Sequence, residues 1–357
     1  MSIDVTTLPN GFRIATDRMD HVETAAIGVW VGVGARHEAP AVNGISHMLE
    51  HMAFKGTARR SAQDIVNEVE SVGGQINAYT SRENTAYYLR VLAEDLPLAV
   101  DILADILQHS TFQADELERE RTVILQEIGQ CNDTPDDVIF DQFQETAYPD
   151  QALGRSILGA SENVRSFDRA ALSGYMAEKY GADRMVLVAS GKVDHRKLVR
   201  LAEDAFGDMK PLGASGAEAA AYRGGHHADD RKLEQLHLVL GYQGVAYDDP
   251  DFFTMGALSS VLGGGMSSRL FQEIREKRGL VYSIFTFHAA YRDGGLFGLY
   301  AGTGADDVPE LMPVVLDEIS AVGENVTEEE LARVKAQLKS GLLMAMENTR
   351  SRAERLG

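Results

Sequence analysis

The feature of this sequence that most limits its fold is an order of predicted elements that occurs twice, on either side of a linker. The segment 211–232, PLGASGAEAAAYRGGHHADDRK, is rich in glycine, alanine and charge and lacks apolar periodicity, which is the composition of a linker. After it, the order of strand, helix, strand and long helices returns. We therefore expect an α+β fold with two repeats, over 1–212 and 232–357, joined by a linker over 213–231.

The repeat is clearest in one pair of helices. Residues 112–132 are echoed at an offset of 214, which matches Glu116 to Glu330. On this offset Glu120 becomes Val334 and Glu127 becomes Gly341. The helix that corresponds to 44–54 contains neither histidine nor glutamate. The halves are thus expected to share a fold, while only the first keeps a cluster of polar residues.

The charge of the chain excludes several classes of partner. The formal net charge is −20 with a pI near 4.9, so the surface repels nucleic acid and anionic membranes and attracts basic peptides. Cys131 is the single cysteine, so an internal disulfide is not possible. The start lacks the pattern of a signal peptide, and no apolar run reaches the roughly 20 residues that cross a bilayer. We expect a cytoplasmic protein without membrane insertion.

The stretch NGISHMLEHMAFKGT, residues 43–57, carries the strongest chemical signal. His47 and His51 stand at i and i+4 of a predicted helix, so both imidazoles lie on one face and can ligate one Zn²⁺. Glu50 borders the same patch, where a general base would face a water molecule. The order H-x-x-E-H is the inverzincin signature. The alternative is a surface helix whose histidines pair with Glu50.

A third ligand is needed, and the helix DELERERTVILQEIGQ offers two carboxylates. Glu120 and Glu127 are seven residues apart, nearly two turns, and project from one face. Val123 and Ile124 are expected on the same side, which indicates a partly buried functional face. Acidic helices with mixed faces are common, so the spacing alone does not decide between a ligand and a solvated glutamate.

Taken together, these residues make the chain resemble the pitrilysin (M16) metallopeptidases. His47, Glu50 and His51 are followed by Glu127 at a distance of 76 residues. The likeness is greatest to bacterial relatives of the mitochondrial processing peptidase β subunit, and it covers nearly the whole chain through the motifs TLPNG, GARHE, GISHMLEHMAFKGT, INAYTSRENTAYY, LQEI and LGGGMSSRLFQEIREKRGLVYS. It implies the metallohydrolase fold of that family, in which each repeat is an antiparallel-rich sheet flanked by helices.

The resemblance also implies roles for these residues. His47, His51 and Glu127 would ligate one Zn²⁺ per chain, Glu50 would activate the attacking water, and Glu120 would support the ligands. The activity implied is that of a zinc endopeptidase.

Further roles follow from the second half and from a strand of the first. Arg275 and Tyr282 match the family's pair of oxyanion donors; taken alone, they would be a helix-surface charge and a strand residue. Asn77 and Ala78 match an edge strand that pairs with an extended substrate, which is compatible with an ordinary hairpin strand.

Substrate preference is expected from a pair of acidic residues. Asp137 and Asp141 stand at i and i+4 after Pro135, where the processing peptidases have acidic residues that accept an arginine near the cleavage site. An exposed acidic helix face is an equal alternative. The substrates implied are unfolded peptides or presequence-like segments.

Two other functions stay open. The chain could be a non-catalytic core or assembly subunit, although such relatives typically lose zinc ligands that are present here. It could also be a peptide-binding subunit that is active only with a partner chain. The resemblance implies a homodimer or a heterodimer with a related subunit, and it implies that the second repeat, which stops at Gly357, is incomplete.

Overall fold

The computed structural model describes residues 3–214 and 216–357, so the first two residues of the predicted first repeat and residue 215 of the predicted linker lie outside it. The chain forms two compact units. The first contains the chain up to Gly129, Arg155–Glu218 and Met344–Gly357; the second contains Gln130–Gly154 and Ala219–Leu343. Among the described residues, no helix is both long and apolar enough to cross a bilayer.

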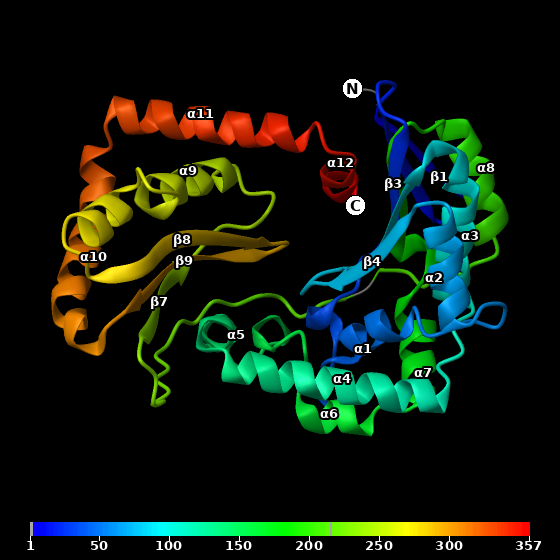
Figure 1. Ribbon diagram of the computed structural model, residues 1–357, viewed down its shortest axis with the longest axis horizontal. Helices are drawn as coiled ribbons and strands as arrows, with labels where there is room; N and C mark the ends of the chain where they lie inside the picture. Colours follow the sequence, from blue (N-terminus) through cyan, green and yellow to red (C-terminus); the bar gives the residue numbers. More distant parts are fainter. Residues whose placement is uncertain (1–2, 215) are drawn as a thin grey trace. The chain divides into compact units, whose positions relative to one another are not determined.

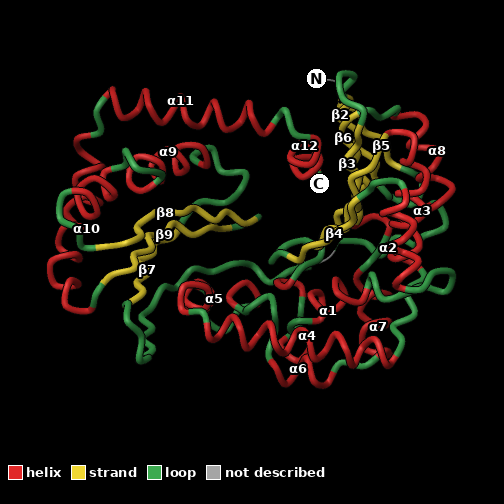
Figure 2. The backbone as a smooth tube through the Cα atoms, viewed as in Figure 1, coloured by secondary structure: helices red, strands yellow, loops and turns green. Residues whose placement is uncertain are grey.

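The first unit is built on a six-stranded sheet with the order β1-β2-β6-β3-β5-β4 (Figures 1 and 2). Its strands are β1 Ile3–Thr7, β2 Arg13–Arg18, β3 Thr24–Val31, β4 Gln75–Thr80, β5 Thr85–Leu92 and β6 Met185–Gly191. Only the β2–β6 pair is parallel among the described strands, and the other pairs of this sheet are antiparallel. The sheet is therefore antiparallel-rich, and β4 forms one of its edges.

Both faces of this sheet are covered, as the alternation along β3 shows. Ile27 and Val29 belong to the main core under the helices, whereas Ala26 and Trp30 face a smaller apolar cluster that includes Ala353 of α12. Figure 2 shows α12 on one side of the sheet and α2, α3 and α8 on the other. The helices of this unit are α1 Ile45–Met52, α2 Ala62–Ser71, α3 Leu96–Gln108, α4 Ala114–Asp133 with its last turn in the second unit, α6 Ser161–Ser166, α7 Arg169–Lys179, α8 His195–Phe206 and α12 Thr349–Leu356.

The second unit has a three-stranded antiparallel sheet in the order β7-β9-β8. Phe140 stacks on Phe285 and Tyr300 on one face of this sheet, and the main core of the unit fills the other. Gly241 on β7 lets the ring of Phe143 approach closely, because a Cβ there would lie 2.1 Å from that ring. The elements of this unit are α5 Pro135–Ala147, β7 Leu236–Gln243, α9 Phe252–Gly263, a π-helical segment Phe271–Glu276, β8 Val281–Tyr291, β9 Gly294–Thr303, α10 Val308–Asn325 and α11 Glu328–Ala345, whose last residues belong to the first unit.

Two helices that correspond on the offset of 214 each pack in the unit formed mainly by the other half of the chain. On the offset of 214, the starts of α4 and α5 at Ala114 and Pro135 correspond to the starts of α11 and α12 at Glu328 and Thr349. Yet α5 packs on β7 in the second unit, and α12 packs on the sheet of the first. Each predicted repeat is one continuous stretch of the chain, whereas each compact unit combines separate segments of it.

A mostly buried ion pair joins the glycine-rich stretch of the second unit to α11. Arg269 binds both oxygens of Glu330, with Nε to Oε1 at 2.6 Å and Nη2 to Oε2 at 2.7 Å. Glu330 Oε2 also accepts the N–H of Thr327 and so closes the N-terminus of α11. The hydrogen bonds from Arg269 lower the pKa of Glu330 from 4.5 to about 2.

We predict that Glu330→Gln destabilises the second unit by about 2 kcal/mol at pH 7, because it leaves a mostly buried guanidinium without its charge partner. Since the pKa of Glu330 is lower in the folded state, its contribution is present above pH 4.5 and is lost as the pH falls toward 2. Urea denaturation followed by circular dichroism measures both effects. Glu329→Gln is the control, since the Glu329 side chain is 89% exposed and lies 3.7 Å from Arg333; equal losses in both variants would contradict the prediction.

Candidate metal centre

The helix that carries the histidines is fixed at its N-terminus by a buried carboxylate. Glu38, 3% exposed, accepts the N–H groups of Gly44 and Ser46, each at 2.8 Å, and the side-chain amide of Asn43 at 3.0 Å. Gly44 has a φ of 98°, which suits glycine and lets the chain turn into α1. Sequence reasoning missed the role of Glu38, although it ends the GARHE motif.

The apolar face of α1 determines where its polar residues point. Ile45, Met48, Leu49 and Met52 are at most 2% exposed and belong to the main core of the first unit. The remaining positions include His47 and His51, whose ring centroids are 4.7 Å apart. The two imidazoles therefore lie together on the face of α1 turned away from its apolar contacts, as the i, i+4 spacing predicted.

Helix α4 places a carboxylate against both rings. Glu127 Oε2 lies 3.7 Å from Nε2 of His47 and 3.7 Å from Nε2 of His51. Ile124, between the two glutamates, is buried, whereas Val123 is 44% exposed, so only one of the two apolar residues expected on this face is buried.

The donor set fits a zinc ion. Two imidazole nitrogens and one carboxylate oxygen lie within 4.8 Å of one another. This is the one such group of three among the residues that the structure describes. Tetrahedral bonds of about 2.0–2.1 Å would place ligand atoms about 3.4 Å apart, close to the two 3.7 Å separations. An ion held by these three side chains would keep a fourth position open, as in catalytic rather than structural sites.

Glu120 contacts His51 on the side of the ring away from Glu127. Its Oε2 is 2.9 Å from Nδ1 of His51, the ring nitrogen opposite the one that faces Glu127, and its Oε1 is 2.7 Å from Nζ of Lys55. Burial alone would raise the pKa of Glu120, but the hydrogen bonds with Lys55 and His51 outweigh it and lower that pKa. Sequence reasoning missed Lys55, although it stands four residues after His51 in the same motif.

Glu50 is next to the candidate ligands without being part of their group. It lies on α1 between the two histidines, and burial raises the pKa of its carboxyl. On the neighbouring strand β4, Thr80 Oγ1 donates to the carbonyl of Ser46 at 3.4 Å, which holds the end of the edge strand against α1. Asn77 and Ala78 are on this strand, and the N–H of Ala78 is accepted by Asn77 Oδ1 at 2.8 Å.

The remaining predicted residues belong to the second unit and are described there alone. Arg275 and Tyr282 lie together, with the guanidinium carbon 5.5 Å from the centroid of the tyrosine ring, and Tyr282 is 76% exposed. Asp137 and Asp141 are on α5, the first exposed and the second half-buried. The structure thus brings together His47, Glu50, His51, Glu120 and Glu127 in one unit and Arg275 with Tyr282 in the other.

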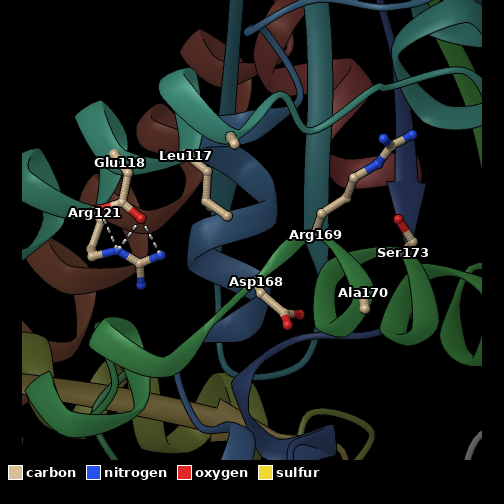
Figure 3. A pocket seen from close by; sticks show the side chains of 8 residues that line it. Leu117, Glu118, Arg121, Asp168, Arg169, Ala170 and Ser173 are labelled. Carbon is tan, nitrogen blue, oxygen red and sulfur yellow. Dashed lines mark hydrogen bonds and ion pairs between the residues drawn. The ribbon is translucent and has the colours of Figure 1, made fainter.

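A depression elsewhere on the first unit carries no comparable chemistry. It has a volume of about 590 Å³ between α4 and α7, and Figure 3 shows its lining residues. Arg121 pairs with Glu118 and donates to the carbonyls of Val164 and Phe167, while Asp168 caps α7 through the N–H of Ala171. These polar groups are occupied in holding the helices.

Burial of His47 makes a prediction for the metal-free protein. Burial and the nearby His51 lower the pKa of His47 from 6.5 to about 4, so the unfolded state binds the proton more tightly. This contribution to stability is present above pH 6.5 and is lost as the pH falls toward 4; between pH 8 and pH 5 it amounts to about 2 kcal/mol. Urea denaturation of chelator-treated wild type and His47→Gln should show a flatter pH dependence in the variant. Parallel curves would rule this out.

Comparison with known proteins agrees with this site. Residues 13–161 match the family model described as insulinase (peptidase family M16), and residues 166–338 match the one described as the peptidase M16 inactive domain. An uncharacterized zinc protease of Streptomyces coelicolor is 41% identical over 99% of this chain and 79% of its own length. One of Bacillus subtilis is 39% identical over 98% of this chain and 86% of its own.

A mitochondrial-processing peptidase subunit beta of Lentinula edodes is 39% identical over 99% of this chain and 80% of its own length. Among solved structures, a protease from Helicobacter pylori has the same fold, with a TM-score of 0.90 and 23% identity over 98% of this chain and 87% of its own. The resemblance inferred from the sequence motifs is thereby confirmed. By the match of both family models and the identity to these relatives, the chain belongs to peptidase family M16.

Proposed function

We propose that this protein is a zinc-dependent endopeptidase that cleaves unfolded peptides or presequence-like segments and favours a basic residue near the scissile bond. The observation that carries the proposal is the convergence of His47, His51 and Glu127 from two helices, with Glu50 beside them. The zinc protease names of two relatives support Zn²⁺ as the metal, and the single group of three candidate ligands among the described residues supports one ion per chain.

The chemistry divides between the ion and the residues around it. Held by His47, His51 and Glu127, Zn²⁺ would acidify a water molecule and polarise the scissile carbonyl. Glu50 takes the proton from the attacking water and delivers it to the leaving amine. Glu120 holds the ring of His51 through Nδ1.

We assign substrate binding to the free edge of β4. This strand pairs only with β5 among the described strands, so its other edge can add an extended peptide by main-chain hydrogen bonds. Asn77 and Ala78 supply the contact: the peptide would replace the bond that the Ala78 N–H now makes to the Asn77 side chain. Such pairing binds peptide without reading its sequence.

Further roles belong to residues of the second unit. We assign oxyanion stabilisation to Arg275, whose guanidinium lies against the Tyr282 ring, and to the exposed Tyr282 itself. Asp137 and Asp141, one turn apart on α5, are assigned to the basic residue of the substrate. The duplication of the two halves, supported by the offset of 214 in the starts of their helices, accounts for a second half without metal ligands.

Association with a second copy or with a related subunit is part of the proposal, and the subunit name of the Lentinula edodes relative supports it. A cytoplasmic location stays a prediction from the sequence.

The decisive experiment is Glu50→Gln in the full chain. We expect the variant to keep one equivalent of zinc and to lose peptide cleavage by about 10²- to 10⁴-fold, the usual contribution of a general base. Zinc is measured by elemental analysis and cleavage with a fluorogenic peptide library. Glu70→Gln, at an exposed position of α2, is the matched control and should cleave normally.

Three outcomes distinguish the candidates. Cleavage by Glu50→Gln at the wild-type rate would refute the assignment of the base. Wild type that binds zinc but cleaves no peptide, alone or with a related subunit, would favour the non-catalytic core subunit. Cleavage that appears only after a related subunit is added would identify a peptide-binding subunit that needs its partner.

The specificity assignment has its own test. Asp137→Asn/Asp141→Asn should lower kcat/KM for peptides with an arginine near the cleavage site by about tenfold or more, the value of a charge-assisted pair, with a much smaller effect on neutral peptides. The control Asp133→Asn/Asp136→Asn removes the same charge from the adjacent exposed acids. Equal losses for both kinds of peptide would eliminate the assignment.

A further inference from the structure

From the contacts around Glu120, we infer that Lys55 is a positioning residue of the metal centre: it anchors the Glu120 carboxylate so that this group holds His51 with Nε2 free to bind the metal. The inference rests on the proposed zinc site. It assigns a role to a residue that is neither a ligand nor a base.

The first step concerns the two oxygens of Glu120, each of which has a different partner. Oε1 lies 2.7 Å from Nζ of Lys55 and Oε2 lies 2.9 Å from Nδ1 of His51. The Glu120 side chain is 9% exposed and that of Lys55 is 31% exposed, so water competes little for the carboxylate. A carboxylate with an ion pair at one oxygen cannot rotate freely about its terminal bond. Its other oxygen is therefore held toward the imidazole of His51.

The second step concerns the proton on His51. A lysine ammonium only donates, so a carboxylate that pairs with it acts as an acceptor, and the contact with His51 then needs the hydrogen on Nδ1. A neutral imidazole carries one such hydrogen, which leaves the lone pair on Nε2. Nε2 is the atom that lies 3.7 Å from Glu127. The arrangement therefore selects the tautomer that can ligate zinc.

The two histidines differ in how their rings are held. Nδ1 of His47 is buried and has no hydrogen-bond partner within the described chain, so packing holds that side of the His47 ring. His51 is more exposed, at 21% of its side chain, and has the Glu120 contact instead. The residue with less packing is thus the one that depends on Lys55.

The backbone holds Lys55 in place for this contact. Its N–H donates to the carbonyl of Met52, the last residue of α1, at 3.2 Å. Gly56 follows with a φ of 112°, a conformation that favours glycine, and its carbonyl accepts the N–H of Thr111 at 3.1 Å. Lys55 therefore sits in a fixed turn rather than in a free loop.

The test compares Lys55→Met, which keeps the aliphatic length and removes the charge, with Lys55→Arg, which keeps the charge. We expect Lys55→Met to bind zinc about 10- to 100-fold more weakly in chelator competition, the usual effect of losing an outer contact to a ligand, while Lys55→Arg retains most of the affinity. Lys192→Met removes an exposed ion pair with Glu23 and should bind zinc like wild type.

A second measurement separates positioning from simple stability. In metal-free, ¹⁵N-histidine-labelled protein at pH 8, His51 should carry its hydrogen on Nδ1 in wild type, and the Nε2–H form should appear in Lys55→Met. A loss of stability alone would not change the tautomer of the folded protein. Unchanged tautomer and unchanged zinc affinity in Lys55→Met would overturn the inference. If wild type bound no zinc, the proposed function would fail, and the tautomer comparison would still decide the role of Lys55.

Discussion

The burial of the apolar face of α1 is the interaction on which the rest of the site depends. Full burial of a leucine, isoleucine or methionine side chain is worth about 1.5–3 kcal/mol, so Ile45, Met48, Leu49 and Met52 together hold the helix with roughly 6–12 kcal/mol. An unpartnered buried nitrogen, such as Nδ1 of His47, costs about 1–3 kcal/mol. The apolar term is larger, so the helix keeps the one rotation that turns both imidazoles toward α4.

Helix α4 combines a structural and a chemical role on adjacent positions. Leu117 and Ile124 are buried in the same core as α1, while Glu120 and Glu127 meet the histidines. The buried apolar residues fix the axis and rotation of α4. The helix itself therefore sets the positions of both carboxylates. A site carried by two packed helices is held more precisely than one on mobile segments.

Local sequence patterns identified the parts of this structure that depend on local spacing. The helix with the histidines, the break before Pro135 and the β4–β5 hairpin follow from periodicity and turn residues, and they are present as predicted. The insertion of β6 between β2 and β3 could not be predicted, since it joins strands more than 150 residues apart in the chain. The contact of Lys55 with Glu120 could not be predicted either, because a single lysine after a helix belongs to no periodic pattern.

The places of α5 and α12 could not be predicted from the sequence for a different reason. An amphipathic helix shows that it has an apolar face but not which sheet will cover it. Here α12 completes the first unit: Arg352 pairs at 2.8 Å with Asp17, which is 2% exposed, and Ala353 covers the apolar cluster around Trp30. An aspartate buried to that degree without its arginine would cost about 3–5 kcal/mol. The stability of the half that carries the candidate metal ligands therefore depends on a segment from the half that lacks them, which is a physical reason for the two to remain in one chain.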